Sequence, residues 1–137
     1  MSMVLDSSIT LAWVYREETT ESVNAVFENL SHAGAWVPGL WRLEVAIVLQ
    51  VGVRRRRHDA AFRDSALSDL ALFPIHLDLE TDRQAWGATA RLAERHGLTL
   101  YDAAYLELAL RRGLPLATLD RELRAAARGE KVKVLGV

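Results

Sequence analysis

The chain contains no cysteine among its 137 residues. This absence excludes a disulfide framework, a thiolate zinc site and a cysteine nucleophile, and it is typical of a reducing compartment. Long apolar runs are also missing, because the longest, residues 45–49 and 70–73, are far shorter than the ~20 residues of a membrane-spanning helix. The N-terminus lacks a basic segment followed by an apolar signal region, so we expect a cytoplasmic protein without membrane contact.

A strong net charge is absent as well, since the formal charge is −1 at pH 7. This balance argues against a generally basic nucleic-acid-binding protein. Lysine occurs only at positions 131 and 133, so arginine supplies nearly all the positive charge. Four arginines are consecutive, and we interpret them either as the solvated end of a helix or as an edge that contacts RNA phosphates: Arg54, Arg55, Arg56 and Arg57.

Half of the residues are hydrophobic, and no repeat, low-complexity segment or linker divides the chain, so we expect one domain over residues 1–137. Hydrophobic periodicity and turn residues predict strands at residues 3–5, 35–37, 74–77, 115–118 and 132–135. Helices are predicted at residues 7–14, 20–33, 40–54, 58–72, 81–96, 99–112 and 121–128. This alternation predicts an α/β fold, a three-layer α/β/α sandwich around a mostly parallel five-stranded sheet.

Two of the predicted helices begin with the spacing of a capping box. Thr99 precedes Asp102 by three residues, and Thr81 precedes Gln84 by three. The helix at residues 40–54 is apolar almost all round, which predicts that it is buried on several sides or forms half of an interface.

Acidic residues stand where predicted strands or loops lead into helices. Asp6 follows the first strand, Asp102 lies in the first turn of its helix, and Asp120 follows the fourth strand. Each of them alone is explained by helix capping. Glu44 is different because it lies on the apolar face of its helix, where an unpaired carboxylate is costly to bury. Its partner is therefore either a salt bridge from a distant residue or a metal ion.

These acids can meet at one place, because the carboxyl ends of parallel strands lie at the same edge of a sheet. Four carboxylates in one crevice repel one another unless a counter-charge is present. A hard cation with oxygen ligands, Mg²⁺ or Mn²⁺, supplies that charge. The pattern favours such a site over capping alone for four residues, which we call the acidic quartet: Asp6, Glu44, Asp102 and Asp120.

The sequence resembles the PIN-domain family and, within it, the VapC-like toxins of toxin–antitoxin pairs. The matching pieces span the chain: VLDSS at residues 4–8, Glu44, LYDAAY at residues 100–105, and TLD at residues 118–120. The resemblance implies the sheet order 3-2-1-4-5 and a Mg²⁺- or Mn²⁺-dependent endoribonuclease. The acidic quartet matches the catalytic, metal-binding acids of the family, while Ser8 and Thr118 match its small hydroxyl positions beside them.

The resemblance also implies roles and partners. Asp6 and Asp102 would be the principal metal ligands, with Glu44 and Asp120 as outer or second-metal ligands that position water. Ser8 and Thr118 would orient a carboxylate or a water. The family commonly forms homodimers, and its toxins are silenced by a small VapB-like antitoxin that lies in an apolar groove. Candidate surfaces are the helices at residues 40–53 and 9–15 with Trp13 and Trp41, although core packing explains these aromatics equally well.

Two other functions compete with this interpretation. A phosphotransfer enzyme could use Asp6 as its nucleophile, but haloacid-dehalogenase-like phosphatases need a second acid at the position that Ser8 occupies. The other alternative is a catalytically silent PIN-like module that binds RNA or a protein without cleaving anything.

Overall fold

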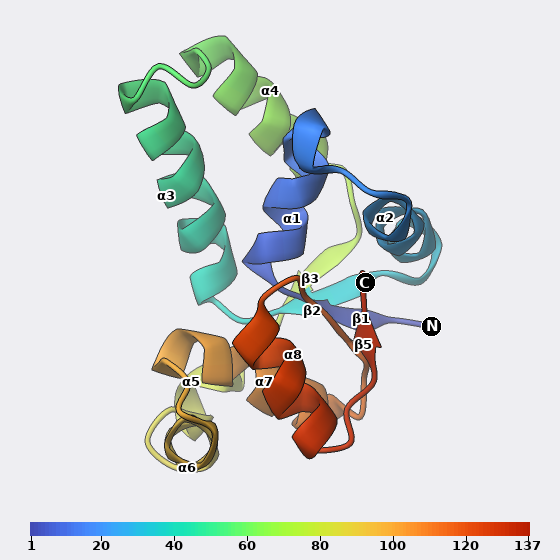
Figure 1. Cartoon of the computed structure of the whole chain (residues 1–137), viewed down its shortest axis with the longest axis vertical. Helices are drawn as coiled ribbons and strands as arrows, with labels where there is room; N and C mark the ends of the chain where they lie inside the picture. Colours follow the sequence, from blue (N-terminus) through green and yellow to red (C-terminus); the bar gives the residue numbers. More distant parts are fainter.

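The computed structural model describes residues 1–137, and a five-stranded sheet runs through its centre (Figure 1). The strands are β1 (Met3–Leu5), β2 (Ala35–Val37), β3 (Ile75–Leu77), β4 (Leu116–Ala117) and β5 (Val134–Leu135). Their order is β3-β2-β1-β4-β5, and every pairing is parallel. The predicted order 3-2-1-4-5 is therefore confirmed, and the sheet is wholly parallel.

Helices connect the strands and cover both faces of the sheet. In chain order they are α1 (Ser7–Val14), the 3₁₀ helix η1 (Arg16–Glu18), α2 (Glu21–Ala33), α3 (Leu40–Arg54), α4 (Ala60–Ala71), α5 (Thr81–Gln84), α6 (Ala88–His96), α7 (Leu100–Arg112) and α8 (Arg121–Gly129). Figure 1 shows α1 and α2 on one side of the sheet and α7 and α8 on the other, while α3 and α4 form a hairpin that extends away from it. The predicted three-layer architecture is confirmed.

No helix combines the length and the apolar character that crossing a lipid bilayer requires.

The central strands are buried on both faces, as parallel sheets usually are. Every residue of β1 and β4 is fully buried. The two strands pair in register, with Leu5 opposite Ala117. The residues that follow them, Asp6 and Thr118, therefore leave the sheet side by side.

One predicted helix is wrong in its extent. Residues 81–96 form two helices, α5 and α6, separated at residues 85–87. The capping box that begins at Thr81 is also wrong, because Glu80 occupies the N-cap and the Thr81 hydroxyl donates to Asp78 Oδ2 at 2.8 Å. The helix predicted from residue 58 begins later, since Asp59 caps α4 by accepting from the Phe62 amide at 2.8 Å.

Helix α3 is buried on one face only. Its apolar side chains on the other face are exposed, with Leu43 at 68% and Ile47 at 60%. Trp41, by contrast, is buried and donates from Nε1 to Thr10 Oγ1 at 3.0 Å. Trp13 packs inward too, stacked on Phe27 with ring centroids 4.7 Å apart. The two tryptophans are thus explained by packing, whereas the outer face of α3 is free for a partner.

Candidate active site

Asp6 directly follows β1, close enough to the other three acids of the quartet for their charges to interact. Its side chain is buried, with only 3% of the residue exposed. Asp6 Oδ2 accepts hydrogen bonds from Ser8 Oγ and Thr118 Oγ1, both at 2.7 Å. Ser8 comes from the first turn of α1 and Thr118 from the end of β4, so the pairing of β1 with β4 assembles this contact. The structure brings both predicted hydroxyls to Asp6, and their role in orienting it stays a prediction.

The other two junction acids differ in what they do locally. Asp120 caps α8, because its Oδ1 accepts from the Leu123 amide at 2.8 Å, and its own amide donates to Thr118 Oγ1 at 3.1 Å. Asp102 does not cap its helix, since Thr99 holds the N-cap and accepts from the Asp102 amide at 3.1 Å. Asp6 makes no side-chain capping bond at the start of α1. Capping therefore accounts for only one of the three.

Glu44 has a partner that the sequence interpretation did not identify. Its Oε1 accepts a hydrogen bond of 2.5 Å from the hydroxyl of Tyr105, a fully buried residue of α7. Of the two partners considered from the sequence, a salt bridge from a distant residue is absent. Helical spacing could have indicated the Tyr105 hydroxyl as the partner. Residues three apart share a helix face, so Tyr105 lies on the same face of α7 as Asp102.

The ionisation of the acidic quartet reflects both burial and mutual repulsion. Burial raises the pKa of Asp102 to about 6, and the negative charges of Asp120, Asp6 and Glu44 contribute to this increase. Burial also raises the pKa of Asp6, against hydrogen bonds from Thr118 and Ser8 that lower it. Burial raises the pKa of Glu44 as well, although the Tyr105 hydrogen bond opposes this. The charges of the other three acids thus all raise the pKa of Asp102, and the charge of Asp6 raises that of Glu44, so the four carboxylates lie close enough to act on one another.

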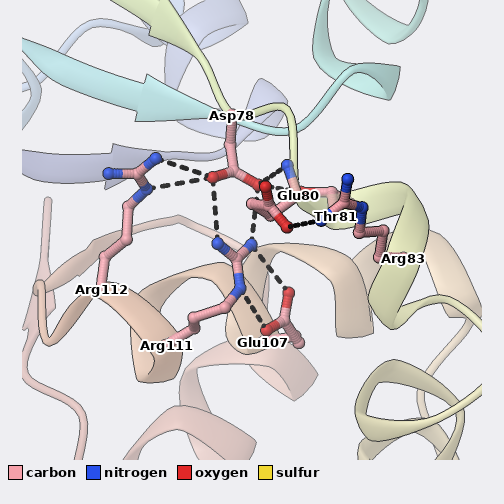
Figure 2. A network of polar contacts seen from close by, with 7 residues as sticks. All are labelled: Asp78, Glu80, Thr81, Arg83, Glu107, Arg111 and Arg112. Carbon is pink, nitrogen blue, oxygen red and sulfur yellow. Dashed lines mark hydrogen bonds and ion pairs between the residues drawn. The ribbon is translucent and has the colours of Figure 1, made fainter.

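No member of the acidic quartet forms an ion pair. The other buried acids of the chain are neutralised by arginines (Figure 2). Asp78, whose side chain is fully buried, pairs with Arg111 at 2.7 Å and Arg112 at 2.9 Å, and Glu107 pairs with Arg111 at 2.8 Å. Burial alone would raise the pKa of Asp78, but hydrogen bonds from Arg111, Thr81 and Arg112 lower it far below its usual range. Among the buried acids, Asp6 alone therefore lacks a cationic partner, and the three half-buried acids of the quartet lack one too.

The donors of the quartet fit a hard divalent cation in kind. They are carboxylate oxygens with neighbouring hydroxyls, without sulfur or imidazole, which suits Mg²⁺ or Mn²⁺ rather than a softer metal. Their present arrangement is not a finished coordination site, because no group of three or more His, Cys, Asp or Glu side chains is placed to hold an ion. Binding would require the carboxylates to move closer together.

The arginine run divides into two parts in the structure. Arg54 ends α3, and Arg55 and Arg56 follow it in an exposed turn without ion pairs. Arg57 is already engaged, because it pairs with Glu17 at 2.7 Å and Glu18 at 2.6 Å and lies over the Tyr15 ring at 3.5 Å. Three of the four arginines thus remain available to an anionic ligand.

Comparison with known proteins agrees with this architecture. The PIN domain profile matches residues 3–129. Ribonuclease VapC3 of Pyrobaculum aerophilum is 33% identical over 125 residues, which cover 90% of this chain and 92% of the relative. The crystal structure of PAE2754 from the same organism superimposes with a TM-score of 0.71 at 26% identity, covering 98% of this chain and 83% of that one.

A further solved structure supports the fold alone. It is VapBC2 of Rickettsia felis bound to a DNA fragment from their promoter, with a TM-score of 0.65 at 14% identity. The superposition covers 98% of this chain and 97% of the other. Since the family profile spans nearly the whole sequence and the fold matches throughout, the chain belongs to the PIN domain family.

Proposed function

We propose that this chain is a Mg²⁺- or Mn²⁺-dependent endoribonuclease that hydrolyses RNA phosphodiester bonds at the acidic quartet, as the toxin of a toxin–antitoxin pair. The observation that carries the proposal is a contrast between two groups of acids. No basic side chain pairs with the quartet, whereas Arg111 and Arg112 pair with the buried acids Asp78 and Glu107. The relationship to a protein named a ribonuclease supports the choice of reaction.

Each residue of the quartet receives a role from its surroundings. Asp6 and Asp102 are the principal metal ligands, because one is fixed by two hydroxyls and the other is the most crowded by negative charge. Glu44 and Asp120 lie beside them and position the attacking water. Ser8 and Thr118 hold the Asp6 carboxylate in one orientation through their 2.7 Å hydrogen bonds, which limits the reorganisation that metal binding would need.

The chemistry that Mg²⁺ or Mn²⁺ supplies when bound is Lewis acidity towards the phosphodiester, together with a lowered pKa of the attacking water. The chain itself supplies orientation. The half-buried carboxylates of Glu44 and Asp120 orient the attacking water, and exposed Arg54, Arg55 and Arg56 contact phosphates further along the RNA.

We also propose that the toxin forms a homodimer and binds a small VapB-like antitoxin in the cytoplasm. A groove of about 610 Å³ beside the quartet offers apolar side chains from α3, α5, α7 and the neighbouring segments. Trp86, 98% exposed, stands at this groove. Light scattering on the purified chain tests the dimer, and a monomer at micromolar concentration would contradict it.

The experiment that tests the proposed function is cleavage of a mixed RNA pool by the purified chain with Mn²⁺ or Mg²⁺. We expect cutting that disappears in chelator and in Asp6→Asn, but persists in Asp69→Asn, which changes an exposed aspartate of α4. Cutting that persists in Asp6→Asn would contradict the assigned site. A wild type that binds RNA and cuts nothing would support the catalytically silent module instead.

A further inference from the structure

Tyr105 contacts the acidic quartet through Glu44, and the charge of Asp6 also acts on it. It is fully buried in α7, and its hydroxyl makes the 2.5 Å hydrogen bond to Glu44 Oε1. This length is typical of a hydroxyl that donates to a charged carboxylate. It is also shorter than the hydrogen bonds that hold Asp6 and Asp120, which are 2.7 and 2.8 Å long.

Packing alone does not explain a tyrosine at this position. A phenylalanine would fill the same space, whereas a buried tyrosine hydroxyl needs a partner. Glu44 accepts the hydrogen bond from this hydroxyl and lies 61 residues earlier in the chain, and the Ser7 side chain also acts on both groups. The contact joins α3 to α7, the two helices that carry Glu44 and Asp102.

The donor is also held on a rigid element. Arg111 and Arg112 tie the end of α7 to Asp78, the residue after β3 (Figure 2). Arg112 also lies over the Trp36 ring at 3.5 Å. Tyr105 sits two turns before these anchors, so its hydroxyl is held in place to orient the Glu44 side chain.

We infer that Tyr105 is a positioning residue that fixes the Glu44 carboxylate for divalent metal binding. This inference rests on the proposed function and deepens it. Tyr105 touches neither the metal nor the RNA, and it acts only through Glu44. Removing its hydroxyl takes away the 2.5 Å hydrogen bond that orients the Glu44 carboxylate, which weakens the site without changing its charge.

The test is a double-mutant cycle with Tyr105→Phe, Glu44→Gln and the combined variant, measured by titration with Mn²⁺ and by RNA cleavage. We expect Tyr105→Phe to bind Mn²⁺ about 10- to 100-fold more weakly and to lower kcat by a similar factor, the usual effect of losing such a support. KM for RNA should stay at its wild-type value. In the Glu44→Gln background, Tyr105→Phe should have no additional effect.

Two further variants separate positioning from general stability. Tyr15→Phe removes the hydrogen bond of another buried tyrosine, between its hydroxyl and His58 Nε2 at 2.8 Å, and should leave Mn²⁺ affinity unchanged. Glu44→Asp keeps the charge but shortens the side chain, so that the carboxylate withdraws from Tyr105. It should weaken Mn²⁺ binding, and adding Tyr105→Phe to it should weaken binding no further, whereas an additional loss would contradict the contact.

The outcomes distinguish the positioning role of Tyr105 from the proposed metal-dependent cleavage. Wild-type Mn²⁺ affinity in Tyr105→Phe, or an equal loss in the Glu44→Gln background, overturns the positioning role while metal-dependent cleavage by the wild type upholds the function. A wild type that neither binds Mn²⁺ nor cuts RNA overturns both.

Discussion

The carboxylate of Asp6 and the hydroxyl of Thr118, 112 residues apart in the chain, lie 2.7 Å from each other. The contact exists because β1 and β4 are neighbours in the sheet and end at the same level. A connection of this kind cannot form within one segment of the chain. The sheet order, rather than any local motif, is what builds the crevice.

Neutralising Asp102 should leave the metal-free protein at least as stable as the wild type. Burial and three neighbouring carboxylates raise the pKa of Asp102 to about 6, so its charged form is disfavoured in the folded state. We expect Asp102→Asn in chelator to raise the unfolding free energy by roughly 1 kcal/mol, allowing for the partial exposure of the side chain, and to abolish cleavage. Thermal melts beside Asp69→Asn measure this, and a clearly lower melting temperature would favour a structural role.

The stability of the metal-free protein should fall as pH rises from about 4 to 6. In this window folded Asp102, with its pKa of about 6, binds more protons than the unfolded chain, where an aspartate titrates near ~3.9. The unfolding free energy should therefore decrease by roughly 1 to 2 kcal/mol through this residue. Denaturant titrations in chelator at several pH values measure the slope, and Asp102→Asn should flatten it. A wild-type stability that rises steadily across the window would contradict the crowding of these acids.

Removing the charge of Asp78 should be strongly destabilising. Asp78→Asn leaves Arg111 and Arg112 without their carboxylate (Figure 2), and breaking such a pair costs about 2 to 4 kcal/mol when the arginines are partly exposed. The wild-type contribution is present above the unfolded pKa and is lost as pH falls below ~4, because the folded pKa of Asp78 is lowered.

The matched control for that variant is Glu80→Gln, which removes an exposed acid paired with Arg83 at 3.3 Å. Its effect on the unfolding free energy should stay within about 0.5 kcal/mol, as for most surface pairs. Equal effects of the two variants would show that the buried network does not anchor α7.

Neutralising the exposed turn after α3 should weaken RNA binding mainly at low salt. We expect Arg55→Gln with Arg56→Gln to reduce the slope of log affinity against log salt by roughly 1.4, at about 0.7 per lost phosphate contact on single-stranded RNA. The control is Arg91→Gln with Lys133→Gln, which removes two exposed charges elsewhere. The binding assay uses Asp6→Asn so that RNA stays intact. An unchanged slope for the first pair would exclude this surface.

The sequence predicted the fold because its signals are local. Short apolar runs bounded by turn residues fix β1 and β4, and Thr99 and Gly113 mark the ends of α7, as the structure confirms. The strand order came from resemblance to a family. The cap of α5 could not be predicted, because the Thr81 hydroxyl donates to Asp78, whose other partners lie more than 30 residues away on α7.

The site was predictable in composition but not in its contacts. Acids that follow neighbouring parallel strands predict that their carboxylates meet, and the structure brings the quartet together at the ends of β1 and β4. The contact of Tyr105 with Glu44 could not be predicted, because a tyrosine on an apolar helix face is usually a core residue. Arg57 looked like its three neighbours, and only the fold shows that Glu17 and Glu18 occupy it.

Calorimetric titration of the wild type, Asp102→Asn and Asp69→Asn with Mn²⁺ tests whether the acidic quartet forms a hard-cation site. We expect saturable binding by the wild type and Asp69→Asn, and a loss of at least about 10-fold in affinity for Asp102→Asn, since that variant removes a ligand. Equal affinities in all three, or no binding by the wild type, would contradict it.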